Sequence, residues 1–187
     1  MDKIDILLTL YSIVSGLGLS RLIQGAAEMI EGRDRLKFYW LHTSWLALVF
    51  MAHVVSWFAL MRFSTGAHWT VFNATGALCM PILLYLLSDL LVPRTVSEEP
   101  VSLRNHYYRN FRWLTGLLGA FVVLGIAVQA AVERSYDWSE GGYLRLIALV
   151  VLVAGFMSPR PAVQAAQTLA LLVVCMTGAT LISMQLM

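Results

Sequence analysis

Long apolar stretches alternate with short polar segments along this chain. A helix needs about 20 mainly apolar residues to cross the hydrocarbon core of a bilayer, and six stretches approach or exceed that length, at residues 4–30, 38–62, 69–92, 111–132, 142–158 and 162–186. The segments between them are too short to form a soluble domain. The pattern predicts an all-α integral membrane protein, in which residues 1–187 form a single polytopic domain of six transmembrane helices joined by short loops. For 142–158, the shortest stretch, a re-entrant element stays open as an alternative.

The composition supports a location in the membrane. Hydrophobic residues make up 59% of the chain and charged residues 13%, against about 25% charged residues in soluble domains. The net charge of +2 comes from basic residues in short loops, so we expect the lipid bilayer as the partner and no nucleic acid. The general character of the chain is that of a multi-pass protein of the bacterial inner membrane.

The distribution of Lys and Arg predicts the orientation of the chain, because these residues accumulate in cytoplasmic loops. Eight belong to the first, third and fifth loops: Arg33, Arg35, Lys37, Arg94, Arg104, Arg109, Arg112 and Arg160. Four belong to the opposite side: Lys3, Arg62, Arg134 and Arg145. We therefore expect both termini on the non-cytoplasmic side.

Arg21 lies within the first apolar stretch, where a charged side chain is costly. An Arg at the centre of a membrane helix costs about 2.5–3.5 kcal/mol on insertion scales, so it usually faces protein or water and has a partner. Asp89 is the nearest acidic candidate, at a depth that differs by about 6 Å. A structural ion pair, a site that binds a solute, and snorkelling of Arg21 to lipid headgroups remain open as interpretations.

Several polar residues share the half of the bundle predicted to face the cytoplasm. Together they predict a polar vestibule or a set of ion-pair partners: Arg21, Gln24, His42, Ser88, Asp89, Gln164 and Gln167. Intramembrane ionisable residues often mark the pathways of ions and solutes. The sequence thus favours a protein that binds or passes a small solute or ion. The alternative is a non-catalytic accessory or scaffold subunit that uses these residues for helix pairing.

Small residues and one proline indicate how the helices pack. Ser12, Gly16 and Ser20 recur every four residues, a spacing that allows a neighbouring backbone to approach closely. Pro81 lies inside the third stretch, where it removes a helical hydrogen bond and favours a kink. The glycines of the fourth stretch offer a surface for a second copy, which favours a homo-oligomer or a larger membrane complex: Gly116, Gly119 and Gly125.

The sequence gives weaker support to a cofactor site, a metal site or a catalytic site. His42 and His53 lie eleven residues apart on one helix face, a spacing that suits haem, but the other histidines, His68 and His106, fall in loops on opposite sides. Cys and Met pairs recur as soft ligands of the kind that bind Cu(I), at Cys79, Met80, Cys175 and Met176. The chain has no HExxH, GxSxG or phosphate-binding glycine loop. We expect no cofactor, no metal and no catalytic residues, and enzymatic activity is not favoured.

Overall fold

The computed structural model describes residues 3–62, 69–93, 101–134 and 138–186. Within them the chain forms six α-helices: α1 (Lys3–Glu31), α2 (Trp40–Arg62), α3 (Val71–Leu91), α4 (Leu103–Glu133), α5 (Glu140–Met157) and α6 (Pro161–Leu186). All six are long and apolar enough to cross a membrane. The fifth predicted stretch is one unbroken helix of 18 residues. The protein is therefore a polytopic membrane protein built mainly as a bundle of α-helices.

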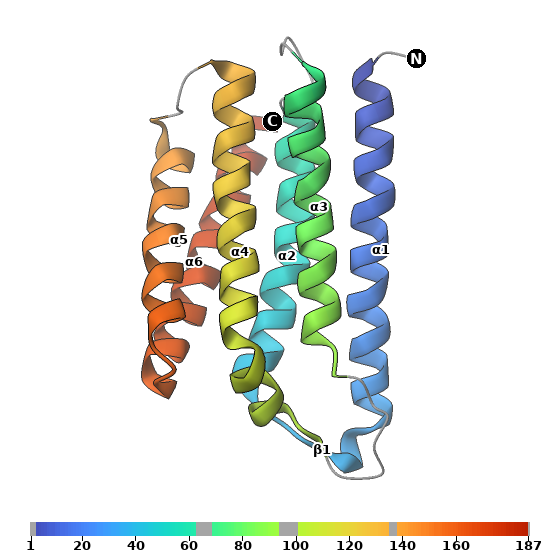
Figure 1. The fold of residues 1–187 in the computed structure, drawn as a ribbon, viewed down its shortest axis with the longest axis vertical. Helices are drawn as coiled ribbons and strands as arrows, with labels where there is room; N and C mark the ends of the chain where they lie inside the picture. Colours follow the sequence, from blue (N-terminus) through green and yellow to red (C-terminus); the bar gives the residue numbers. More distant parts are fainter. Residues whose placement is uncertain (1–2, 63–68, 94–100, 135–137, 187) are drawn as a thin grey trace.

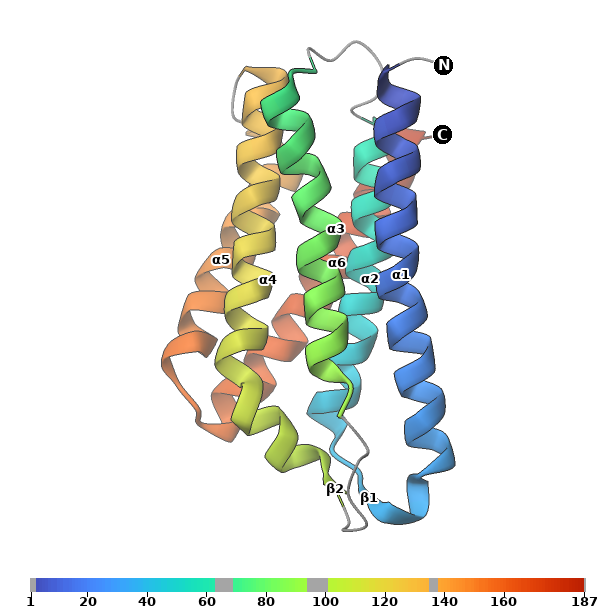
Figure 2. The same cartoon turned by 45° about the vertical axis from the view of Figure 1, so that its right-hand side comes forward.

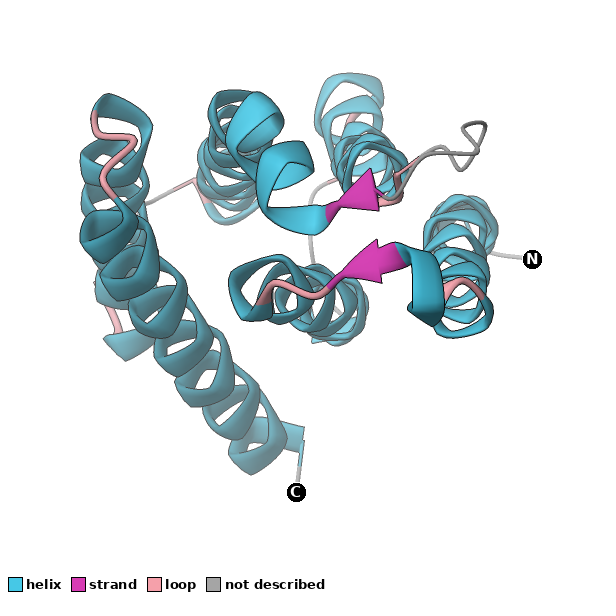
Figure 3. Ribbon diagram, turned by 90° about the horizontal axis from the view of Figure 1, so that it is seen from below, coloured by secondary structure: helices cyan, strands magenta, loops and turns pink. Residues whose placement is uncertain are grey.

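Successive helices run in opposite directions, so both termini lie at one end of the bundle (Figure 1). We call this the terminal end. Helix α1 packs against α2 and α3, and α3 packs against α4. The hairpin of α5 and α6 lies beside this group, where α5 contacts α4 and α6 contacts α2 (Figure 3).

A pair of short strands at the opposite end was not predicted from the sequence. Strands β1 (Leu36–Lys37) and β2 (Val101–Ser102) pair in parallel, with Leu36 opposite Val101. Each strand leads into a helix of the same direction, which explains why the pairing is parallel (Figure 2). We call this the strand end. A 3-10 turn at Arg33–Arg35 connects α1 to β1.

Helix α4 begins at Leu103 rather than at residue 111, where the apolar stretch begins. The side chain of Ser102 accepts a hydrogen bond from the Asn105 backbone N–H and so caps the helix. Hydropathy marks the part of a helix that suits lipid, whereas the cap marks where the helix starts, so the predicted boundary was wrong.

The packing face of α1 also differs from the prediction. The buried residues, at spacings of three or four, are Leu7, Tyr11, Ser15, Gly18, Leu22 and Gly25. Gly18 lies against the His53 side chain, and Gly25 lies against Val92.

The predicted ridge of Ser12, Gly16 and Ser20 is exposed, and open space surrounds Gly16. At the ridge, Ser12 Oγ accepts a hydrogen bond from Trp57 Nε1 of α2 at 2.9 Å. Helix α1 carries two faces with small residues, and the packing of a further neighbour on the predicted ridge remains a prediction. The bundle uses the face that also bears Tyr11 and Leu22.

The other small or rigid residues noted in the sequence differ in their burial. Helix α3 continues without interruption through the buried Pro81, and the predicted kink remains a prediction. Gly116 lies near Phe156 of α5, and Gly125 lies near Met80 of α3. Gly125 therefore has a contact to α3 within the chain, whereas Gly116 is exposed, and the packing of these glycines against a second copy remains a prediction.

Candidate functional site

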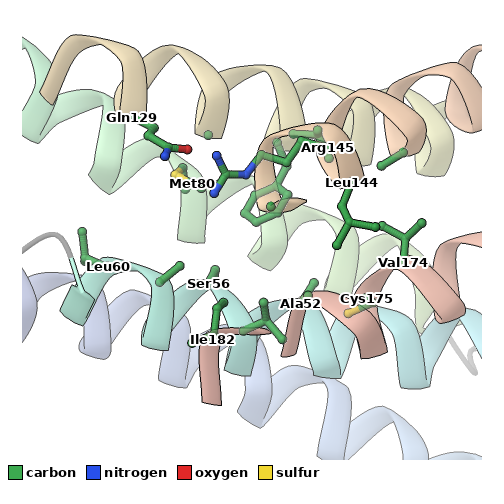
Figure 4. A pocket seen from close by; sticks show the side chains of 18 of the residues that line it. Ala52, Ser56, Leu60, Met80, Gln129, Leu144, Arg145, Val174, Cys175 and Ile182 are labelled. Carbon is green, nitrogen blue, oxygen red and sulfur yellow. The ribbon is translucent and has the colours of Figure 1, made fainter. Parts of the chain in front are cut away.

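A cavity of about 350 Å³ occupies the half of the bundle nearer the terminal end. Its walls come mainly from α2, α3, α4, α5 and α6, and Figure 4 shows side chains of these helices around it. Most of the lining is aliphatic, with Leu60, Leu144, Val174 and Ile182 among the larger side chains. The site is thus a largely apolar space inside the predicted membrane region.

The cavity exists because small residues meet where the helices face one another. Ala52, Ser56 and Ala59 line it from one face of α2, at spacings of four and three residues. Gly125 lines it from α4 and Gly178 from α6. A Cβ at Gly178 would meet no atom within 4 Å. In close-packed interiors such space is uncommon, so the run of small residues accounts for it.

Two buried donors on one wall of the cavity have no partner with hydrogen-bond geometry among the described residues. These are the Tyr11 hydroxyl and the Trp69 indole N–H. The Tyr11 side chain is fully buried, with an exposed fraction of 1%. A buried polar group without a hydrogen bond typically costs about 1–3 kcal/mol. The two groups therefore mark a place where a bound molecule would be stabilised.

The other wall of the cavity carries charged and amide groups. Arg145 extends from α5 toward Gln129 of α4 (Figure 4), and Gln129 donates a hydrogen bond to Glu133 Oε2 at 3.1 Å. Glu140 also lines the cavity. From the sequence we used Arg145 only to predict the orientation of the chain, and the structure shows that it lies in α5 and lines the cavity.

The cavity ends before it reaches the strand end of the bundle. Its lining residues closest to that end are Leu48, Leu118, Leu152 and Leu171, all of them buried. Beyond them, Trp45, Tyr107 and Leu114 have no exposed surface and fill the core. The structure therefore shows a blind cavity rather than a path through the bundle.

Arg21 and Asp89 meet, as expected, but outside this cavity. Arg21 Nε donates a hydrogen bond to Asp89 Oδ1 at 2.9 Å, and Arg21 Nη1 lies 3.9 Å from Glu28 Oε1. The Arg21 and Asp89 side chains are 21% and 37% exposed, so the pair lies at the edge between α1 and α3. Gln24 is exposed and donates to Ser20 Oγ of the same helix at 3.3 Å.

His42 and Ser88 belong to separate contacts in the core. His42 Nε2 donates a hydrogen bond to the Leu91 carbonyl oxygen at 2.8 Å. This carbonyl belongs to the last turn of α3, where a helix leaves its carbonyl groups without partners. The His42 ring also packs against that of His106, with centroids 5.7 Å apart. His106 is in the first turns of α4 and not in a loop. Ser88 Oγ lies 3.2 Å from His53 Nε2 and donates to the Leu84 carbonyl.

Gln164 and Gln167 join α6 to its neighbours at the strand end. Gln164 accepts a hydrogen bond from the Tyr107 hydroxyl and donates to the carbonyls of Gly155 and Ser158, each at 2.7 Å. Gln167 Nε2 lies 3.5 Å from Thr115 Oγ1 of α4. Their hydrogen bonds tie α6 to α4 and α5.

The metal interpretations find no convergent ligand set in the part of the chain that the structure describes. No group of three or more His, Cys, Asp or Glu side chains there is placed to hold a metal ion. His53 is engaged at both ring nitrogens, since Ser15 Oγ lies 3.0 Å from its Nδ1. Cys175 and Met80 line the cavity, whereas Met176 is 54% exposed.

None of the seven predicted site residues lines the cavity. The structure places them in three groups, at the edge of α1 and α3, around the end of α3, and at the base of α6. A vestibule among them remains a prediction. The sequence reasoning missed the cavity residues, of which Tyr11, Ser56 and Gly178 are the most informative. The available signal was the small-residue face of α2, formed by Ala52, Ser56 and Ala59.

No protein-family model, curated protein or solved structure matches the chain. Its function is therefore inferred from its own geometry.

Proposed function

We propose that this membrane protein binds a small, mainly apolar molecule in the cavity near the terminal end. The observation that supports the proposal is the cavity itself, whose volume of about 350 Å³ falls within the range of about 300–1,000 Å³ for ligand pockets. Its aliphatic walls favour apolar matter, and its few polar groups would orient a ligand. From the sequence we expected a solute site in the half of the bundle predicted to face the cytoplasm. The site proposed here lies in the half nearer the terminal end.

Binding is better supported than passage, because the cavity is blind toward the strand end. A continuous path would require Trp45, Tyr107 and Leu114 to move, and these side chains are fully buried in the largest hydrophobic cluster. The proposal therefore retains the binding part of the expected function and leaves transport out.

A leucine at Gly178 should fill the cavity and prevent binding. The probe is benzophenone, a rigid two-ring molecule that reacts with nearby C–H bonds on illumination. Wild-type protein in lipid nanodiscs should be labelled at cavity residues, and Gly178→Leu should weaken saturable labelling by at least about tenfold through steric exclusion. Stability should not fall, because the site has open space and Leu favours a helix by about 0.5–1 kcal/mol over Gly.

The matched control is Gly119→Leu on α4, because Gly119 also has open space around its Cβ position but does not line the cavity. Gly119→Leu should be photolabelled by benzophenone at the cavity residues to the same extent as the wild type. Labelling that is unchanged in Gly178→Leu, or that maps only to lipid-facing residues, would reject the binding function.

The excess of basic residues near the strand end supports an orientation in which the cavity faces the non-cytoplasmic side. In a background without Cys79 and Cys175, a cysteine at Ser139 should react with a membrane-impermeant maleimide added to intact cells. A cysteine at Asp34, whose side chain is 92% exposed, should react only after the cells are opened. The reverse pattern would invert the proposed orientation.

The outer face of α1 favours a second candidate function, that of an accessory or scaffold subunit. The exposed ridge of Ser12, Gly16 and Ser20 and the partly exposed pair of Arg21 and Asp89 lie where another transmembrane helix or a second copy could pack. Polar groups are costly in lipid, so a helix that packs over them would be stabilised. The test is removal of the Arg21 charge, with copurification of a partner as the readout.

A further inference from the structure

We propose that the molecule bound in the cavity is neutral and carries a hydrogen-bond-acceptor oxygen, such as a carbonyl, which meets the Tyr11 hydroxyl and the Trp69 indole N–H. This inference rests on the proposed binding function and adds the chemical class of the ligand.

The Tyr11 hydroxyl is the first observation. It is buried against the cavity and lies beside the Ser56 side chain, but it makes no hydrogen bond of proper geometry with a described residue. Ser56 donates its own proton to the His53 carbonyl at 3.0 Å, so it does not donate to the Tyr11 oxygen. No described residue accepts the Tyr11 O–H with hydrogen-bond geometry, and this O–H can donate to a molecule in the cavity.

The Trp69 indole is the second observation. Its Nε1 atom is buried and lacks a hydrogen-bond partner among the described residues. An indole N–H can donate but cannot accept. Trp69 packs in the same hydrophobic cluster as Tyr11, Leu60 and Ala77, so both donors belong to one wall. Two donors on one wall select a ligand that presents an acceptor.

Charge and volume narrow the ligand further. Arg145 and Glu140 are the charged residues of the lining and have opposite signs, so the formal charge of the lining is zero. An engineered apolar cavity of about 150 Å³ holds a single benzene, and this cavity measures about 350 Å³. It has room for a molecule of about two rings, or an apolar chain of similar bulk.

Benzophenone and 1,1-diphenylethylene test the role of the acceptor, because the two molecules share one shape and differ in a carbonyl oxygen replaced by a CH₂ group. Benzophenone affinity comes from the concentration dependence of photolabelling, and diphenylethylene affinity from its protection against labelling. Wild-type protein should bind benzophenone about three- to tenfold more tightly, after correction for partitioning into lipid, as one net hydrogen bond provides.

Tyr11→Phe removes the hydroxyl alone. It should remove most of the preference for benzophenone over diphenylethylene, with little change in the affinity for diphenylethylene. Trp69→Phe should also reduce the preference, and it provides a second variant should Tyr11→Phe fail to fold. The matched control is Tyr143→Phe, because Tyr143 is 53% exposed on α5 and lies outside the cavity. It should keep the wild-type preference.

The outcomes separate the ligand class from the binding function. Equal affinities for the two probes in the wild type, or an unchanged preference in both Tyr11→Phe and Trp69→Phe, would overturn the acceptor proposal. If the acceptor proposal fails in this way but Gly178→Leu still excludes both probes, the binding function is retained and only the ligand class is rejected. Absence of saturable labelling in the wild-type cavity would overturn both.

Discussion

Replacing Gln164 with leucine is expected to destabilise the protein by about 3–5 kcal/mol. The side chain has no exposed surface, and its amide joins the Tyr107 hydroxyl to the carbonyls of Gly155 and Ser158. Leucine has similar bulk but cannot form these bonds, so up to three polar groups lose a partner, each at about 1–3 kcal/mol. The measurement is the free energy of unfolding in mixed micelles under increasing denaturing detergent.

Gln24→Leu is the matched control, since Gln24 is exposed on α1 and its amide contacts Ser20 of the same helix. It should change the free energy of unfolding by less than about 0.5 kcal/mol. A loss below about 1 kcal/mol for Gln164→Leu would show that the hydrogen bonds at the base of α6 do not stabilise the bundle.

Removing either charge of the Arg21 and Asp89 pair should also be costly, by about 1–3 kcal/mol. A fully buried pair loses about 3–5 kcal/mol when one partner is removed, and partial exposure of both side chains reduces this value. Arg21→Gln and Asp89→Asn, alone and combined, measure the coupling through a double-mutant cycle. The double variant should lose less stability than the sum of the two single losses.

The exposed pair of Arg33 and Asp34 provides the control, because its charged atoms lie 4.0 Å apart on side chains that are 76% and 92% exposed. Arg33→Gln and Asp34→Asn should show almost no coupling. Strictly additive losses at Arg21 and Asp89 would contradict a stabilising pair. If Arg21→Gln folds with wild-type stability but loses a copurifying membrane protein, the accessory function gains support instead.

The positions of the six helices could be read from the sequence, because hydropathy and length decide whether a segment suits lipid. The meeting of Arg21 and Asp89 could also be anticipated. A charge at membrane depth needs a partner, and the sequence offers few acidic residues at a similar depth. These features depend on single segments or on rare residues, so they do not require knowledge of how the helices are arranged.

The faces that pack and the position of the cavity were decided by the tertiary structure. In a membrane helix both the lipid-facing and the core-facing sides are apolar, so hydropathy does not separate Ser15 and Gly18, which are buried, from Gly16, which is exposed. The cavity arises from the joint placement of Ser56, Gly125 and Gly178 on three helices. The space left between facing side chains is a property of the assembled bundle, and no single segment of the sequence encodes it.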